Sequence, residues 1–215
     1  MHGSYTPKGL YRTYPNLLTY EGVLGMEQGA RCKPENSNWL PFIRNAVGPM
    51  DFTPGSMFSA QPEDNRSTGA NPMGTGTRAY QMALYVVFES PLQMLADNPV
   101  LYRREHPCTE FLAAVPTTWD SLRVLRAACG REVVVARRKG DKWYVGGITN
   151  DRPYTTEIAL DFLPAGRTFT MTSFEDGVNA DLQATDYRKR VREVDASTVV
   201  KVEMVRNGGW AAVIE

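Results

Sequence analysis

The sequence predicts a chain of two fold classes, an α/β region over residues 1–116 followed by an all-β region over residues 117–215. Two observations indicate this division. In the first region, short apolar runs bounded by glycine and proline alternate with stretches of helical period, as in parallel β/α units. From Thr117 onward, short segments of alternating apolar and polar residues are separated by turn sequences, as in an antiparallel β-sandwich.

Strand-like runs occur in the first region near residues 1–4, 15–21, 48–53 and 90–95. We expect the first run to be cut off by the start of the chain. A short strand followed by a helix is the parallel β/α unit. Four such units make half of an eight-stranded barrel or a small open sheet.

Helices are predicted between and after these runs. Residues 77–89 are predicted to form a helix because aromatic and aliphatic side chains recur there at helical spacing. Asp97 or Asn98 is expected to cap a helix that begins at Pro99. Residues 60–76, which are rich in glycine, asparagine and proline, are predicted to form a polar loop.

The second region is predicted to contain seven short strands joined by turns. One pair forms a hairpin, because the turn sequence Arg138-Lys-Gly-Asp141 lies between its two apolar segments. The seven predicted strands cover residues 122–126, 131–137, 142–149, 155–162, 168–174, 197–205 and 210–214. Trp143 and Trp210 fall on two of these strands, and we expect them in the sandwich interior.

Composition excludes several classes of partner. The chain has 24 basic and 24 acidic residues, so nothing in its charge predicts nucleic acid as a partner. No apolar run is long enough to span a bilayer, so no membrane insertion is predicted. The three cysteines, Cys32, Cys108 and Cys129, are widely spaced and form no metal-binding motif, and their odd number argues against a disulfide framework.

Two glutamates six residues apart are the first candidate site. Glu21 and Glu27 flank the segment Gly22-Val-Leu-Gly-Met26, directly after a strand-like run. The two glycines let the backbone turn so that the carboxylates converge. Converging carboxylates bind a hard cation or transfer protons. The alternative is a pair of solvated glutamates on a surface loop.

Several longer segments resemble one enzyme family in their order along the chain. They are His2-Gly3, Pro7-Lys-Gly-Leu-Tyr-Arg-Thr-Tyr-Pro-Asn16, Glu21 to Glu27, Gly48-Pro-Met-Asp-Phe-Thr-Pro-Gly55, Ala83 to Asp97, Val115-Pro-Thr-Thr-Trp-Asp120, Val135 to Gly146 and Gly208-Gly-Trp-Ala-Ala212. The family is glycoside hydrolase family 97, which contains bacterial α-glucosidases and α-galactosidases. The resemblance implies that the chain is the second half of a catalytic (β/α)8 barrel followed by the C-terminal β-sandwich.

The resemblance also implies roles for individual residues. Glu27 matches the catalytic acid of the family, Glu21 and Glu27 match ligands of its calcium ion, and His2 matches a histidine that contacts the substrate. A general acid must be protonated at working pH, which a directly bound cation opposes. We therefore expect weak contact between Glu27 and the metal, or apolar walls around it. Asp51 ends another strand-like run, where barrel active sites collect residues, although a structural hydrogen bond would explain it equally well.

Position 3 separates two mechanisms within the family. The inverting α-glucosidases carry His-Glu where this sequence has His2-Gly3. By the resemblance, glycine at this position goes with retention, with an aspartate nucleophile on an earlier barrel strand, and more weakly with α-galactosidase activity. A retaining pair of carboxyl groups lies about 5–5.5 Å apart. The inverting α-glucosidase remains an alternative.

The abrupt start of the sequence suggests a fragment, and we expect the isolated chain to be inactive because the nucleophile would lie upstream. The expected ligand is an oligosaccharide or α-glycoside. A half barrel would expose sheet edges, so self-association is expected as well. The family is commonly periplasmic or secreted. The other alternative is a non-catalytic carbohydrate-binding or structural β-sandwich.

Overall fold

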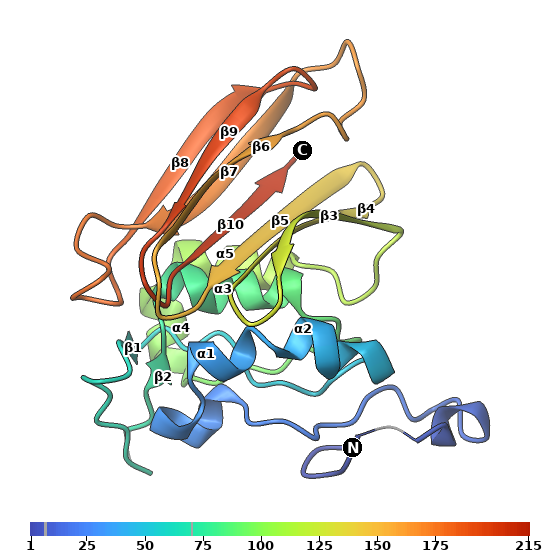
Figure 1. The fold of residues 1–215 in the computed structure, drawn as a ribbon, viewed down its shortest axis with the longest axis vertical. Helices are drawn as coiled ribbons and strands as arrows, with labels where there is room; N and C mark the ends of the chain where they lie inside the picture. The colour runs from blue at the N-terminus through green and yellow to red at the C-terminus, as the bar shows by residue number, and fades with distance from the viewer. Residues whose placement is uncertain (7, 70) are drawn as a thin grey trace.

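Two antiparallel sheets form a β-sandwich in the second region of the computed structural model, which describes residues 1–6, 8–69 and 71–215 (Figure 1). Pro7, in one of the family-like segments, and Ala70, in the predicted polar loop, lie outside the described residues. The larger sheet contains, in spatial order, β3 (Ser121–Ala128), β4 (Glu132–Lys139), β5 (Lys142–Thr149), β10 (Gly209–Ile214), β7 (Phe169–Asp176) and β8 (Tyr187–Val194). The smaller sheet pairs β6 (Tyr154–Ala159) with β9 (Val199–Met204).

The predicted antiparallel region is confirmed, with one strand more than the sequence indicated. Each of the predicted strands is present, and Trp143 and Trp210 are buried between the two sheets. The additional strand is β8, whose sequence Tyr-Arg-Lys-Arg-Val-Arg-Glu-Val is mostly charged and half exposed. An edge strand pairs on one side only and tolerates charges on both faces, so it lacks the alternation used for prediction.

The outer face of the larger sheet is covered by two helices from the first region. Helix α3 (Arg78–Val87) is buried along its whole length, and α5 (His106–Ala114) lies beside it between the strands and the N-terminal segment (Figure 1). Helix α3 is the one predicted at 77–89. Thr77 caps its N-terminus, because the Thr77 Oγ1 accepts a hydrogen bond from the backbone N–H of Tyr80.

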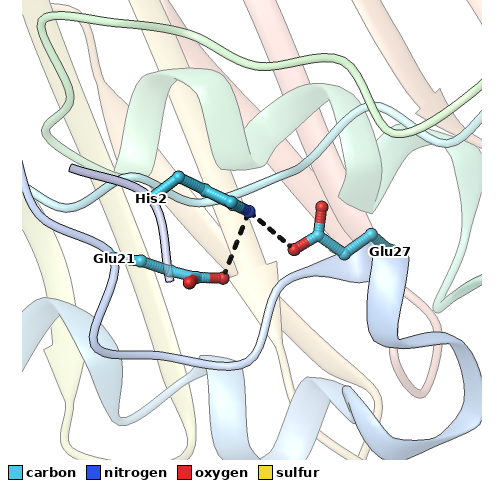
Figure 2. Close-up of side chains that lie close together, drawn as sticks. All are labelled: His2, Glu21 and Glu27. Carbon is cyan, nitrogen blue, oxygen red and sulfur yellow. Dashed lines mark hydrogen bonds and ion pairs between the residues drawn. The ribbon is translucent and has the colours of Figure 1, made fainter. Parts of the chain in front are cut away.

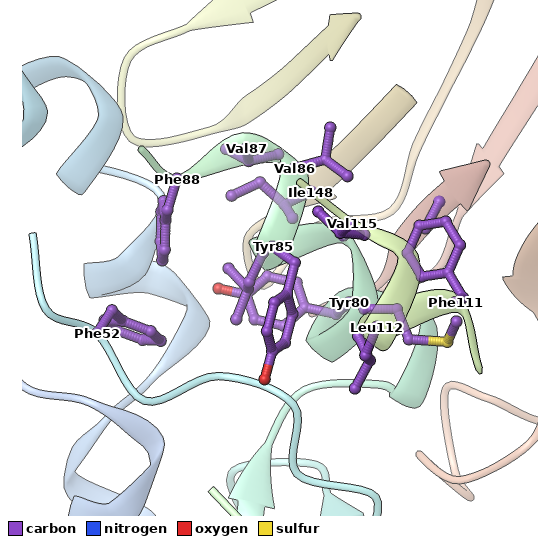
Figure 3. Close-up of a cluster of buried hydrophobic side chains, with 14 of the residues drawn as sticks. Phe52, Tyr80, Tyr85, Val86, Val87, Phe88, Phe111, Leu112, Val115 and Ile148 are labelled. Atoms are coloured by element: carbon purple, nitrogen blue, oxygen red, sulfur yellow. The ribbon is translucent and has the colours of Figure 1, made fainter. Parts of the chain in front are cut away.

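A single hydrophobic cluster joins the helices to the sheet (Figure 3). It contains Tyr80, Leu84 and Val87 of α3, together with Phe111 of α5 and Ile148 of β5. Further members from the sheet are Val133, Val135, Tyr144, Phe174 and Ala211. The two regions therefore share one core across the predicted boundary at residues 116 and 117, which itself stays a prediction.

Two glycines on the sheet allow α3 to approach closely. A Cβ atom on Gly209 would lie 2.4 Å from the Cα of Tyr80 and 2.6 Å from its backbone nitrogen. On Gly146 it would lie 2.8 Å from the Cβ of Val86. The atoms met at Gly209 belong to the helix backbone, so they cannot rotate away.

We expect Gly209→Ala to lower the free energy of unfolding by about 1–3 kcal/mol, the usual effect of overpacking a close-packed core. Urea unfolding followed by circular dichroism measures this effect. Gly69→Ala is the control, because a Cβ there meets no atom of the described residues within 4 Å. Equal stability of the two variants would show that α3 does not need the glycine.

The remaining helices of the described first region are short. They are η1 (Leu10–Arg12), η2 (Met26–Arg31), α1 (Pro34–Ser37), α2 (Leu40–Ile43), η3 (Asn45–Val47) and α4 (Pro99–Arg104). Asn98 caps α4 as predicted, since its Oδ1 accepts hydrogen bonds from the backbone N–H groups of Val100 and Leu101. Among the described residues, no helix combines the length and apolar character needed to cross a bilayer.

The strands predicted in the first region are not formed as regular strands. In the described part of that region, the parallel pair β1 (Ser59–Ala60) and β2 (Gly74–Thr75) lies at the two ends of the predicted polar loop, and one parallel bridge joins Tyr20 to Met50. Residues 90–95, predicted as a buried strand, are irregular, with Leu92 and Leu95 exposed. Prolines 49, 54 and 91 lack the N–H that a continuous ladder needs.

Isolated hydrogen bonds nevertheless align four segments side by side. The N-terminal amine of Met1 donates to the carbonyl of Thr19, and the N–H of Glu21 donates to the carbonyl of Met1 at 3.1 Å. The N–H of Asp51 donates to the carbonyl of Tyr20 at 2.8 Å. The N–H of Met50 donates to the carbonyl of Glu89 at 3.0 Å. Residues near 1, 20, 50 and 89 are thus neighbours in that order.

Candidate functional site

His2 lies between three carboxylates, two of which, Glu21 and Glu27, are drawn in Figure 2. Its Nε2 lies 3.1 Å from Oε1 of Glu27 and 3.6 Å from Oε1 of Glu21, and its Nδ1 lies 3.0 Å from Oδ2 of Asp51. The structure therefore brings together His2, Glu21 and Glu27, the three predicted site residues, and places Asp51, whose role the sequence left open, beside them.

Hydrogen bonds hold both the side chain and the backbone of Glu21 in place. Its side chain is 10% exposed, and its Oε2 accepts a hydrogen bond of 2.6 Å from the N–H of Gly3. The buried guanidinium of Arg44 donates to the carbonyl oxygens of Glu21 and Tyr20 at 3.1 and 2.7 Å. Burial lowers the pKa of Arg44. Gly22 then turns the chain away at a φ of 58°, which glycine adopts readily.

Glu27 lies in the first turn of η2 and is more open to solvent. The N–H of Met26 donates to the carbonyl of Thr53 at 3.1 Å, and the N–H of Glu27 donates to its Oγ1 at 3.3 Å. Gly25 permits this approach, because a Cβ there would overlap the Thr53 hydroxyl. The Glu27 side chain is 36% exposed and borders an open groove that also includes Arg31 and Ser67. A ligand can therefore reach this carboxyl group.

The carboxylates of this cluster shift the pKa of the His2 imidazole. Burial lowers the pKa of His2, but the hydrogen bond to Asp51 and the charges of Glu21, Glu27 and Asp51 outweigh it, so the pKa is raised above its usual value. The raised pKa follows from three carboxylates meeting one imidazole.

The same cluster offers ligand atoms for a metal ion. One ligand atom each from His2, Glu21 and Glu27 lies within 4.8 Å of the others. Calcium prefers oxygen and takes six to eight of them. The carboxylates of Glu21 and Glu27 fit part of such a shell, whereas the nitrogen of His2 does not suit calcium. The donor set of this chain thus fits calcium through its two glutamates.

Three contributors to the site were absent from the sequence analysis or left open there. Arg44 and Thr53 act through backbone contacts across more than twenty residues, for which no motif exists. Asp51 ended a strand-like run, and that position was a usable signal. Cys32 lies nearby as a free, buried thiol, and burial raises its pKa to about 12, which makes it unreactive.

Comparison with known proteins agrees with these observations. Residues 118–215 match the family described as "Glycosyl-hydrolase 97 C-terminal, oligomerisation". A curated protein of Bacteroides thetaiotaomicron, named retaining alpha-galactosidase, is 43% identical over 220 residues, which covers 100% of this chain and 33% of that protein. The chain belongs to glycoside hydrolase family 97.

Other family 97 relatives extend the comparison. A probable retaining alpha-galactosidase of Streptomyces bingchenggensis is 34% identical over 99% of this chain and 30% of its own length. Solved structures of a family 97 enzyme from Pseudoalteromonas sp. strain K8, one in complex with panose and one with acarbose, have a TM-score of 0.87 and 36% identity, covering 100% of this chain and 34% of theirs. The chain spans about a third of the length of these relatives.

Proposed function

We propose that this chain forms part of a retaining α-galactosidase, with Glu27 as its acid/base. The observation that carries the proposal is the arrangement at Gly3. A carboxylate base at this position would make the enzyme inverting, but residue 3 is a glycine and has no side chain to act as a base. Its backbone N–H donates to the buried carboxylate of Glu21. The curated relative with 43% identity over the whole chain is named retaining alpha-galactosidase, which supports the same assignment.

The side chains of this chain would perform the acid and base steps. Glu27 protonates the leaving oxygen while the bond to the sugar breaks, and it then removes a proton from the water that releases the sugar. The Glu27 side chain is exposed to the groove, so a substrate can reach it for both steps. The hydrogen bond from the Glu27 N–H to Oγ1 of Thr53 fixes the backbone of Glu27. Glu21, with a weaker contact from Glu27, would hold calcium, which would supply positive charge to orient and stabilise oxygen atoms of the substrate.

The proposal includes a barrel for the first region. The hydrogen bonds that align residues near 1, 20, 50 and 89 have the order expected of successive parallel strands. His2, Glu21 and Asp51 all lie at the ends of these aligned segments, where barrel enzymes place their active sites. We therefore propose that residues 1–116 form half of a (β/α)8 barrel.

Because the proposal makes this chain part of a longer enzyme, it is tested on that longer protein. Hydrolysis of 4-nitrophenyl α-galactoside, followed by NMR, is expected to release α-galactose first, which is retention. Release of β-galactose would contradict retention, and cleavage of α-glucosides alone would favour the inverting α-glucosidase. Binding of galactosides without turnover would favour a carbohydrate-binding function. The isolated 215-residue chain is expected to be inactive.

Glu21→Gln is expected to weaken calcium binding by about tenfold or more. The change removes a charged oxygen ligand, and even the loss of outer-shell partners costs about 10- to 100-fold in metal affinity. Calcium titration of the longer protein by calorimetry measures the effect. The control is Glu35→Gln, an exposed glutamate of α1. Equal calcium affinity for both variants would remove Glu21 from the metal site.

A further inference from the structure

Asp51 is a buried carboxylate that the acid and base steps do not use. Asp51 is 2% exposed, and its Oδ2 contacts Nδ1 of His2 at 3.0 Å. Its backbone is fixed by the hydrogen bond to Tyr20 and by the parallel bridge between Tyr20 and Met50. Asp51 therefore reaches His2 from a separate and firmly held segment.

The contact with Asp51 determines which ring nitrogen of His2 points toward the glutamates. An ionised carboxylate can only accept a hydrogen bond, so the contact with Asp51 requires a proton on Nδ1 of His2. Nε2 is then directed at Glu27, 3.1 Å away, and at Glu21, 3.6 Å away. A rotated ring would break the contact with Asp51 and move Nε2 away from both glutamates.

The surroundings of Asp51 argue against a role in stability alone. Its second oxygen, Oδ1, is buried and meets no donor among the described residues. A buried polar atom without a partner lowers stability. Within the described part of the chain, His2 is the one side chain bonded to this carboxylate, so the geometry of His2 is what Asp51 maintains.

We propose that Asp51 is the positioning residue of this site. It fixes the tautomer and orientation of His2, so that Nε2 faces Glu27 and the position of the substrate. Carboxylates play the same part behind metal-bound histidines, where their loss lowers activity by about 10- to 100-fold. The catalytic consequence rests on the proposed function, whereas the orientation of the ring does not.

NMR of the chain itself tests the orientation. The sequence contains two histidines, His2 and His106, so His106→Gln assigns the ring signals of ¹⁵N-labelled protein. The wild-type His2 ring is expected to carry a proton on Nδ1. In Asp51→Leu, which removes the acceptor at similar size, Nδ1 is expected to lose that proton and Nε2 to keep one, while His106 stays unchanged.

Two spectral outcomes would overturn the proposal. One is a wild-type His2 ring with an unprotonated Nδ1, which decides the matter even if Asp51→Leu does not fold. The other is an Asp51→Leu spectrum with the wild-type His2 pattern.

Kinetics of the longer protein test the catalytic consequence. Asp51→Leu is expected to lower kcat/KM for α-galactosides about 10- to 100-fold. Asp97→Asn is the control, because that carboxyl group accepts hydrogen bonds from the N–H groups of Met57 and Phe58 instead of His2. Equal losses in both variants would contradict a positioning role. An inactive wild-type protein with the expected NMR result would reject the proposed function and leave the orientation intact.

Discussion

Glu27→Gln in the longer protein is expected to lower kcat for α-galactosides with poor leaving groups by about 10²- to 10⁴-fold, the usual contribution of a general acid. Glutamine keeps the size of the side chain and removes the proton that the leaving oxygen needs. The loss is expected to be smaller for nitrophenyl galactosides, because nitrophenolate leaves with little protonation. This dependence on the leaving group separates an acid from a residue that only binds.

Kinetics on a disaccharide and on 4-nitrophenyl α-galactoside measure the two effects. Glu35→Gln is the matched control, since that glutamate lies exposed on α1. Equal losses on both substrates would make Glu27 a binding or metal residue. Wild-type rates on both substrates would remove it from the reaction.

Asp176 is expected to make stability depend strongly on pH. It ends β7 and is fully enclosed, with Oδ1 2.6 Å from the Thr77 hydroxyl and Oδ2 bonded to the N–H groups of Val205 and Gly209. Burial raises the pKa of Asp176 to about 7, against these hydrogen bonds, which lower it. The protonated acid can donate to Thr77 through Oδ1 while Oδ2 still accepts from the two N–H groups.

The direction of the pH effect follows from the raised pKa. Between about pH 4 and pH 7 the folded state holds a proton that the unfolded state has lost. Stability is therefore highest below pH 4 as far as this group is concerned, and it falls by about 1.4 kcal/mol per pH unit up to pH 7. Above pH 7 the contribution of Asp176 no longer changes.

Asp176→Asn is expected to abolish this slope, because its amide can donate to Thr77 and accept from the two N–H groups as the protonated acid does. Urea unfolding of both proteins from pH 4 to pH 8 measures the difference in their free energies of unfolding. The contributions of the other titrating groups cancel in this difference. Asp161→Asn, at an exposed turn, is the control. Parallel stability curves for wild type and Asp176→Asn would show that Asp176 is ionised throughout.

The sequence predicts the sandwich well because its strands alternate. Each strand with an apolar face was found, and β8 was missed because its charges occupy both faces. The irregular strands of the first region were predicted wrongly as regular ones. Their local apolar runs indicate strands, whereas Pro49 and Pro91 remove ladder bonds, and the pairing involves residues far apart in sequence.

The site was predictable where it follows a motif and unpredictable where it depends on distant contacts. The spacing of Glu21 and Glu27 indicated convergence, and both do meet at His2. Their roles stay predictions. The support from Arg44 and the contact between Asp51 and His2 join residues 23 and 49 positions apart. Such contacts exist only in the folded chain.

The close fit of α3 against Gly146 and Gly209 has a consequence for domain exchange between relatives. A C-terminal sandwich transplanted alone would bring its glycines to a foreign helix and would leave the apolar face containing Ile148 and Phe174 to new neighbours. A chimaera that carries residues 77–215 keeps the helix with its own sheet. The crossover point for recombination therefore lies before Thr77 rather than at the predicted boundary between residues 116 and 117.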